Sequence, residues 1–274
     1  MPISMYRTAT MKRAEASVDM LSGRLPASDE AQRQGLLPLP LPFIHQAEDG
    51  MAPALQITVL HFQPYPFQSA AFHVHGIALP AAIARSVPKR QAEYFFGRLA
   101  ARAALARLGI ADAQIGTGAS RQPLWPAGVV GSISHGGGYA AAVALPAQRH
   151  EAIGIDIEAV VGAEMREALL STAIGLPELA LLHQLNSVNP LEFLMTVVFS
   201  AKESFFKAAF PTVGYYFDFT AVTLTAFDEA RRTLTFRINQ TLSPRLHASA
   251  RFSVDYDLLD AHTVITHCGW RGWV

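Results

Sequence analysis

The chain has 274 residues, of which 50% are hydrophobic and only 16% are charged, a composition that excludes an intrinsically disordered protein. Its 22 Lys and Arg residues balance its 22 Asp and Glu residues, so it lacks the overall basic field expected of a nucleic-acid-binding protein. It has a single cysteine, no apolar run near the roughly 18 residues of a membrane span and no apolar secretory signal, which together predict a soluble cytoplasmic protein without a membrane partner.

The first half of the chain is expected to form strands around one long helix. Residues 1–50 are polar and then rich in proline and leucine, which indicates an irregular, partly extended lead-in. A helix is predicted from Ser86 as its N-cap, with Pro88 in the first turn, to a C-terminal cap at Gly109. Apolar runs bounded by turn residues predict strands over residues 56–62, 71–77, 129–134, 139–145 and 152–158.

The second half is expected to begin with helices and end with strands. Residues 164–185 are predicted to be helical, with a break at Gly175-Leu-Pro177. The next helix should start with Asn189 as its N-cap and end at Phe210, before Pro211. Alternating apolar residues then predict strands around residues 222–224, 234–238, 252–256 and 264–265.

The order of these elements favours one fold class. Few strand–helix–strand repeats occur, so an α+β fold with mostly antiparallel sheets fits better than a doubly wound parallel sheet. We expect two α+β halves, residues 51–150 and 151–274, each with a sheet packed on a long helix and hinged near residues 147–156.

The segment Gly154-Ile-Asp-Ile-Glu158 places two carboxylates on one face of a predicted strand. Side chains alternate along a strand, so Asp156 and Glu158 point to one side while the isoleucines point into the core. Acids about 7 Å apart repel each other unless a cation lies between them, and carboxylate oxygens suit Mg²⁺ or Mn²⁺ better than zinc. The alternative is an edge strand that exposes two acids to water.

Lysine is rare in this chain, yet two lysines lie close together. Only four of the 22 basic residues are lysine, and Lys202 and Lys207 fall within six residues. In Phe199-Ser-Ala-Lys-Glu-Ser-Phe-Phe-Lys207, Glu203 and Lys207 are about one helical turn apart. Because the rest of the window is apolar, this polar stripe is expected to face a cleft, where an ammonium group suits phosphate. The alternative is an ordinary exposed Glu–Lys pair.

Two further patterns could bind an anion. Ser134 and His135 end a predicted strand and lead into Gly136-Gly-Gly138, whose backbone N–H groups can approach an anion closely. Arg90 and Arg98 are eight residues apart on the first long helix, so they lie on roughly the same side and could hold phosphate. The alternatives are a glycine hairpin with an incidental serine and histidine, and an exposed helix face that carries arginine.

These patterns stand along the chain in the order KRQAEYFFGRLAARAAL, RQPLWPAGVVGSISH, GIDIE and FSAKESFFKAAFP. Together they resemble the 4′-phosphopantetheinyl transferases of the surfactin-type class, most closely the branch that includes the enterobactin-synthase component. The resemblance runs from about Lys89 to Phe210, and Phe199 stands where the surfactin-type pattern has tryptophan. It implies a pseudo-symmetric fold of two α+β halves with coenzyme A between them, and two such halves in one chain suggest a monomer.

The resemblance also implies an activity and a set of site residues. The activity is transfer of the 4′-phosphopantetheinyl arm from coenzyme A to a serine of an apo carrier protein, with release of adenosine 3′,5′-bisphosphate. Asp156, Glu158 and Glu203 match the acids that bind Mg²⁺ or Mn²⁺. For catalysis we expect Glu203 to be the base, directly or through a metal-bound water, a metal ligand, or both, and Lys207 to offset charge on the departing bisphosphate. The residues matched to coenzyme A binding are Arg90, Arg98, Arg121, Ser134, His135, Lys202 and Lys207.

The expected partner is an apo acyl, peptidyl or polyketide carrier protein. Because carriers are typically acidic, a local basic patch at Arg231, Arg232, Arg237 and Arg245 is a candidate contact. Two other classes of function stay open. A non-catalytic carrier-binding protein could share the fold, although it would have no need of the acids and lysine. A metal-dependent phosphoesterase would release free 4′-phosphopantetheine without an acceptor.

Overall fold

The computed structural model describes residues 43–47, 55–63, 67–111, 113–186 and 189–270. The fold is of the α+β class, as the sequence predicts, and its sheets are antiparallel. Most of the expected irregular lead-in lies outside the described residues. Residues 43–47, within that lead-in, form a strand rather than irregular chain.

The first sheet is packed against a long helix on one face. Its strand order is β1-β2-β6-β5. Helix α4 (Pro88–Ala106) covers the sheet with Phe95 and Leu105, both fully buried against the alanines of β6. Pro88 is tolerated at the first helical position because the N–H there needs no partner within the helix. The strands are β1 (Phe43–Ala47), β2 (Leu55–His61), β5 (Val129–Gly136) and β6 (Tyr139–Pro146).

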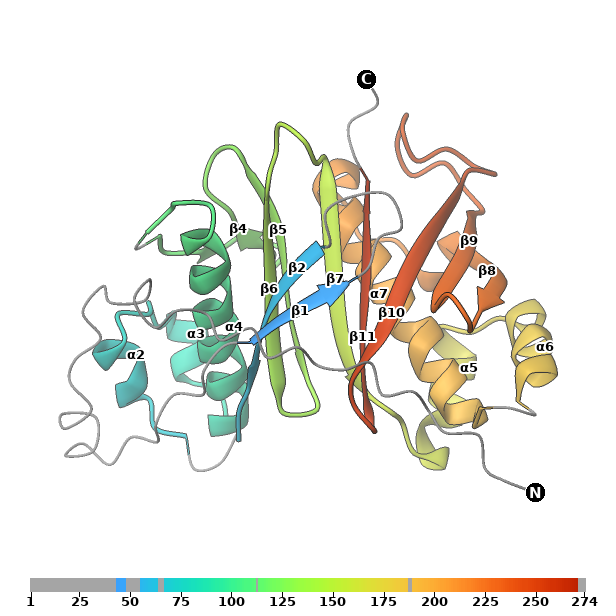
Figure 1. Ribbon diagram of the computed structural model, residues 1–274, viewed down its shortest axis with the longest axis horizontal. Helices are drawn as coiled ribbons and strands as arrows, with labels where there is room; N and C mark the ends of the chain where they lie inside the picture. The colour runs from blue at the N-terminus through green and yellow to red at the C-terminus, as the bar shows by residue number, and fades with distance from the viewer. Residues whose placement is uncertain (1–42, 48–54, 64–66, 112, 187–188, 271–274) are drawn as a thin grey trace.

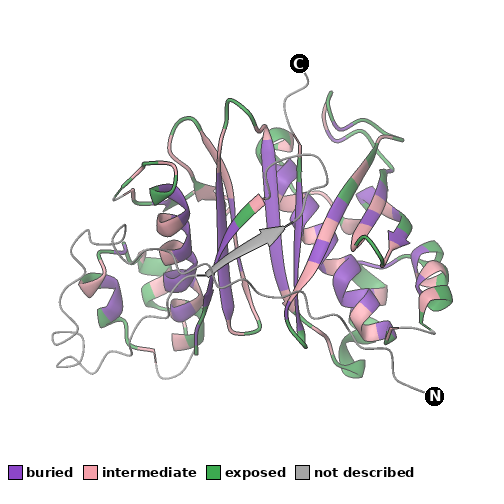
Figure 2. Ribbon diagram, viewed as in Figure 1, coloured by how far each residue is buried: buried purple, intermediate pink, exposed green. Residues whose placement is uncertain are grey.

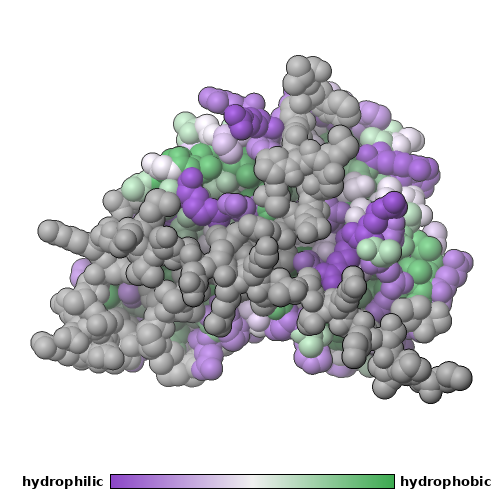
Figure 3. Space-filling model, viewed as in Figure 1, coloured by the Kyte–Doolittle hydropathy of each residue, from purple (hydrophilic) through white to green (hydrophobic). Residues whose placement is uncertain are grey.

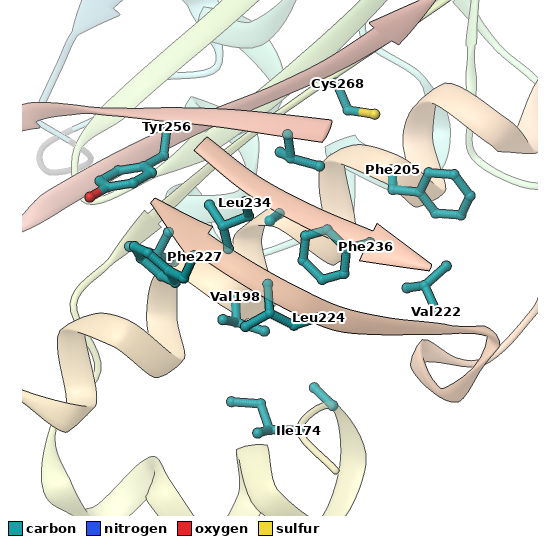
Figure 4. Close-up of a cluster of buried hydrophobic side chains, with 14 of the residues drawn as sticks. Ile174, Val198, Phe205, Val222, Leu224, Phe227, Leu234, Phe236, Tyr256 and Cys268 are labelled. Carbon is teal, nitrogen blue, oxygen red and sulfur yellow. The ribbon is translucent and has the colours of Figure 1, made fainter. Parts of the chain in front are cut away.

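The second sheet repeats this arrangement with a longer helix, α7 (Leu191–Val213). Its strand order is β7-β11-β10-β9-β8. Figure 4 shows Val198 and Phe205 of α7 together with Leu224, Leu234 and Phe236 of the strands in the buried core between helix and sheet. The strands are β7 (Ala152–Ala159), β8 (Val222–Asp228), β9 (Thr233–Ile238), β10 (Arg251–Asp260) and β11 (Thr263–Trp270).

The two sheets pack against each other in the middle of the molecule. Figure 1 shows both sheets at the centre, with α4 beside the first and α7 against the second, and in Figure 2 the central strands are largely buried. Ile57 of β2 and Val143 of β6 meet Ile155, Ile157 and Ile265 of the second sheet in a fully buried apolar layer. The isoleucines of β7 thus point into the core, as strand alternation predicts.

Strands β5 and β7 lie next to each other at the seam between the sheets, and side chains join them. The N–H of Ile155 donates to Ser132 Oγ (3.0 Å) and the N–H of Ile157 donates to Ser134 Oγ (3.2 Å). A Cβ at Gly136 would overlap the carbonyl oxygen of Ile157, so glycine is required for this approach. The serine hydroxyls therefore satisfy backbone groups of β7 that a neighbouring strand would otherwise pair.

The strand predicted for residues 71–77 is wrong. Residues 70–74 form the short helix α2 (Ala70–Val74), which packs Phe72 on Phe95 with ring centroids 5.3 Å apart. A short apolar run carries too little periodicity to separate a strand from one helical turn, and here the aromatic packing determines the outcome. The other predicted strands are present.

Both long helices also differ from the prediction at their ends, and the C-cap of α4 is Arg107, two residues before Gly109. Helix α4 has Val87 as its N-cap, while Ser86 Oγ donates to the carbonyl of Ile83. Helix α7 begins at Leu191 with Pro190, not Asn189, as its N-cap, and it continues through Pro211 to Val213. Proline in the last turn disrupts little of the helix, and Gly214 with φ +78° ends it.

Shorter elements complete the described chain. The predicted break at Gly175 separates α5 (Arg166–Thr172) from α6 (Leu176–Leu185). A further short helix and a two-stranded ribbon lie in the first half, namely α3 (Ala81–Ala84), β3 (Gly116–Thr117) and β4 (Pro123–Leu124). Within the described ranges, no helix is both long and apolar enough to cross a membrane. Figure 3 shows hydrophilic and hydrophobic residues interspersed on the part of this face that is not grey.

Candidate active site

Asp156 is the centre of a buried polar cluster where β5, β7 and α7 meet. The residue is only 3% exposed. Its Oδ1 accepts hydrogen bonds from Lys207 Nζ (2.6 Å) and Ser134 Oγ (2.9 Å), and its Oδ2 accepts one from Ser200 Oγ (2.8 Å). Asp156 is therefore held by donors from a second strand and a helix, and it is not an acid that an edge strand exposes to water.

Helix α7 reaches this cluster because β7 has a glycine at the crossing point. A Cβ at Gly154 would overlap the backbone oxygen of Ser204, so a larger residue would push the helix away. The close approach turns a stripe of polar residues, spaced three and four apart, towards the sheet. These residues are Ser200, Glu203, Ser204 and Lys207.

Lys207 supplies the positive charge of the cluster. Besides Asp156, its Nζ donates to Ser134 Oγ (3.0 Å) and to the carbonyl of Ile155 (3.2 Å). The ion pair in the structure thus crosses the contact between helix and strand, in place of an exposed Glu–Lys pair within one helix. The side chain of Lys207 is 27% exposed, so it is less deeply buried than Asp156.

The other two acids, Glu158 and Glu203, lie where their ionised forms are disfavoured. Burial, and after it the charge of Asp156, raises the pKa of Glu158 from its usual 4.5 to about 7. The same two causes raise the pKa of Glu203, while Lys207 acts in the opposite direction on both. Both carboxyl groups would therefore ionise more readily if a further cation lay among the acids.

The three acids fit a hard divalent cation by charge and by donor type. Carboxylate oxygens are the ligands that Mg²⁺ and Mn²⁺ prefer. The raised pKa of Glu158 and Glu203 shows that their negative charges are unfavourable here, and a divalent cation would stabilise them. In the part of the chain that the structure describes, no three His, Cys, Asp or Glu side chains are already gathered as ligands. Lys207, on Asp156 Oδ1, is the group that neutralises the centre of the cluster.

His135 and Arg90 come together beside this cluster. Arg90 Nη1 of α4 donates to His135 Nε2 at the end of β5 (2.7 Å), and Glu93 Oε2 lies 3.7 Å from His135 Nδ1. Burial lowers the pKa of His135; Glu93 raises it, and Arg90 and Lys207 lower it further. A neutral ring that accepts from Arg90 leaves the arginine with free donors for an anion.

Arg98 and Arg121 lie at the β3–β4 ribbon. The Arg98 guanidinium stacks 4.5 Å from the centre of the Tyr94 ring and donates to Thr117 Oγ1 (2.9 Å). Its buried Nε has no hydrogen-bond partner among the described residues, and burial lowers its pKa. Arg121 is exposed and has a left-handed backbone with φ +66° in the turn of the ribbon. Arg98 thus extends from α4 to β3, and Arg121 lies in the turn of the ribbon, so neither of these two predicted coenzyme A residues is among the hydrogen-bond partners of Asp156 named above.

Lys202 is placed differently from the other predicted site residues. Its Nζ is buried, lies 2.8 Å from Glu178 Oε1 of α6 and donates to the carbonyl of Ala173 (2.7 Å). The same carboxylate accepts N–H groups from Gly175 and Leu224. These contacts link α6, α7 and β8, so in this arrangement the ammonium group supports the packing of the second half and does not face the Asp156 cluster.

Comparison with known sequences places this site in a family. Residues 79–145 match the profile of the 4′-phosphopantetheinyl transferase N-terminal domain, and residues 152–265 match that of the 4′-phosphopantetheinyl transferase superfamily. The two matches together span more than half of the chain. The chain belongs to the 4′-phosphopantetheinyl transferase superfamily. The second match begins at β7, the strand that carries Asp156 and Glu158.

Curated members of the superfamily are similar over part of their length. Enterobactin synthase component D of Salmonella typhi is 37% identical over 61% of this chain and 66% of its own. The 4′-phosphopantetheinyl transferases Npt of Nocardia iowensis and Svp of Streptomyces mobaraensis are each 38% identical, over 52% and 58% of this chain and 62% and 63% of their own. In each case the match spans slightly less than two thirds of the relative.

Several residues of this candidate site were not predicted from the sequence. Ser200 contacts Asp156 directly, Glu93 approaches His135, and Glu178 binds Lys202. The spacing of Ser200 from Glu203 and Lys207 on one helical stripe is the signal that could have identified it. No local pattern connects Glu178 with Lys202, because the two residues belong to separate helices.

Proposed function

We propose that this protein transfers the 4′-phosphopantetheinyl group from coenzyme A to a serine of an apo carrier protein, and that it requires Mg²⁺ or Mn²⁺. The observation that supports this most is the meeting of Asp156, Ser134 and Lys207 at the seam between the two sheets, with Glu158 and Glu203 held at raised pKa beside them. Membership of the superfamily, whose curated relatives include named transferases, supports the same activity.

The reaction is a substitution at phosphorus. The serine oxygen of the carrier forms a bond to the phosphorus that bears the pantetheine arm, and the bond from that phosphorus to adenosine 3′,5′-bisphosphate breaks. Glu203, on the same stripe of α7 as Lys207, accepts the serine proton. Lys207 offsets the charge that develops on the departing bisphosphate.

The remaining residues bind and orient the nucleotide. Asp156, Glu158 and Glu203 would hold the divalent cation, which when bound neutralises charge on the pyrophosphate. Arg90 and His135 hold a phosphate of coenzyme A at the end of β5, and Arg98 of α4 and Arg121 of the ribbon contact the same substrate. The structure gives Ser134 Oγ a full set of protein partners, so Ser134 orients Asp156 and Lys207 as well.

We place the reaction in the cytoplasm and expect a monomer, with an acidic acyl, peptidyl or polyketide carrier as the partner. The arginines considered as a basic patch are mostly paired with acids: Arg231 with Asp228, Arg232 with Asp257 and Arg245 with Glu151. Arginines already neutralised in this way contribute less to steering an acidic partner. The carrier is therefore expected to be recognised mainly by other surfaces.

Intact-mass spectrometry of apo carrier proteins tests this proposal. Each carrier is incubated with the protein, coenzyme A and Mg²⁺, with and without EDTA. A gain of one phosphopantetheinyl group that EDTA abolishes is the expected result. Coenzyme A cleaved without any modified carrier would show a phosphoesterase instead. An intact coenzyme A with no carrier modified, across acyl, peptidyl and polyketide carriers, would contradict the transferase.

A further inference from the structure

Three buried hydroxyl groups form a cluster that contacts Asp156 at Oδ2, whereas Lys207 contacts Oδ1. Ser200 and Ser204 of α7 and Thr266 of β11 are all fully buried, and Thr266 stands directly opposite Asp156 in the β7–β11 register. Thr266 Oγ1 lies 3.0 Å from Ser200 Oγ and 2.5 Å from Ser204 Oγ. Helix and sheet are thus joined by a hydroxyl chain that ends on the carboxylate.

The direction of the hydrogen bonds follows from the number of protons. Thr266 Oγ1 donates to the backbone carbonyl of Ser200 (2.9 Å), which uses its single proton. Ser204 Oγ then shares its single proton between two acceptors, Thr266 Oγ1 and the backbone carbonyl of Thr266 (3.1 Å), and Ser200 Oγ is free to donate its own proton to Asp156 Oδ2 (2.8 Å). Each member of the chain therefore has a partner, which makes a buried network rigid.

We propose that Ser200 is a positioning residue for the active site, fixed by Thr266 and Ser204. It holds Oδ2 of Asp156 on the side of β11, so that Oδ1 faces Ser134 and Lys207. A carboxylate with one oxygen anchored in this way cannot rotate, and groups that orient a metal-binding carboxylate typically change metal affinity 10–100-fold when removed. The inference rests on the proposed function where it concerns the metal, and on the structure alone where it concerns the orientation of Asp156.

The matched pair of variants for this test is Ser200→Ala and Ser132→Ala. Both serines are buried and both substitutions remove one hydroxyl. Ser132 Oγ accepts the N–H of Ile155, beside Asp156, but does not contact the carboxylate. Valine has the same shape as threonine, so Thr266→Val removes the hydrogen bond from Thr266 to the carbonyl of Ser200. The hydroxyl group of Ser200 stays in place.

The first readout uses no metal. With only four lysines in the chain, ¹³C-lysine labelling gives a simple NMR spectrum, and Lys207→Arg assigns the Lys207 signal. We expect Ser200→Ala to shift the Lys207 signal, because Asp156 Oδ1 moves relative to Nζ, and Ser132→Ala to leave it in place. An unchanged Lys207 signal in Ser200→Ala, or equal shifts in both variants, would overturn the proposal.

The second readout is Mn²⁺ binding to the full chain, measured by electron paramagnetic resonance. The dissociation constant should rise about tenfold in Ser200→Ala, less in Thr266→Val, and within twofold of wild type in Ser132→Ala. Equal losses in the two serine variants would show general destabilisation and contradict a positioning role. If wild type binds no Mn²⁺, the metal site of the proposed function fails, and the Lys207 signal alone decides the role of Ser200.

Discussion

Replacing Lys202 by methionine tests whether this lysine supports the fold or binds substrate. Its side chain is 1% exposed and that of Glu178 is 3% exposed, so Lys202→Met leaves a buried carboxylate with only the N–H groups of Gly175 and Leu224 as donors. Removing one partner of such a pair costs about 3–5 kcal/mol in the free energy of unfolding. At about 2–4 °C per kcal/mol, the melting temperature should fall by roughly 6–20 °C.

The matched control neutralises the partner as well. Glu178→Gln alone leaves the buried ammonium with neutral acceptors, the carbonyls of Ala173 and Phe219 and the new amide oxygen, and it should also destabilise the protein. The double variant has no charge at these two positions, so it should lose less stability than the sum of the single variants, by about 1–3 kcal/mol. Urea unfolding followed by circular dichroism gives all four free energies.

One result would refute this reasoning. If Lys202→Met unfolds with the free energy of wild type while the KM for coenzyme A rises, the ammonium group serves the substrate, as the family resemblance implies. A large loss of stability at pH 7 with an unchanged KM in the surviving folded protein supports the structural role.

Four further predictions concern the active site. Asp156→Asn and Glu203→Gln should nearly abolish carrier modification in the mass assay while the circular dichroism spectrum stays native; turnover in either would remove the metal proposal. Lys207→Ala should lower the rate more than tenfold, because a lost transition-state contact costs about 2–4 kcal/mol, and an unchanged rate would exclude its proposed role. Gly154→Ala should displace α7 and lose both stability and transfer, whereas retention of both would show that the helix can move without consequence. Burial raises the pKa of Glu158 from 4.5 to about 7, so its contribution favours folding below pH 4.5 and is lost as the pH rises through 7. Glu158→Gln should therefore stabilise the metal-free protein at pH 8 by about 1–2 kcal/mol, after allowance for solvent screening, and not at pH 4.5; equal effects at both pH values would contradict the raised pKa.

The parts of the site that follow from local periodicity could be predicted from the sequence. Strand alternation places Asp156 opposite the core-facing isoleucines, and helical spacing places Glu203 and Lys207 on one stripe. The contact between these two elements could not be derived from periodicity, since it depends on the missing side chain of Gly154.

Contacts between residues distant in sequence could not be predicted. Lys202 is adjacent to Glu203 in sequence, but one residue of helical rotation turns it towards α6, where it pairs with Glu178, 24 residues away along the chain. Phe72 formed part of a strand-like run, and contact with Phe95 of α4 made it helical. In both cases a partner distant in sequence determined the outcome.

The serine-mediated seam has a consequence for how activity reports on folding. Ser134 both joins β5 to β7 and donates to Asp156, so its hydroxyl belongs to the contact between the sheets and to the proposed catalytic centre at once. A small separation of the two sheets would break the hydrogen bonds of Ser134 to β7 and Asp156 before either sheet or its helix lost structure. Loss of turnover should therefore precede the loss of helical signal as denaturant is raised, and enzymatic activity becomes a sensor for the docking of one sheet on the other.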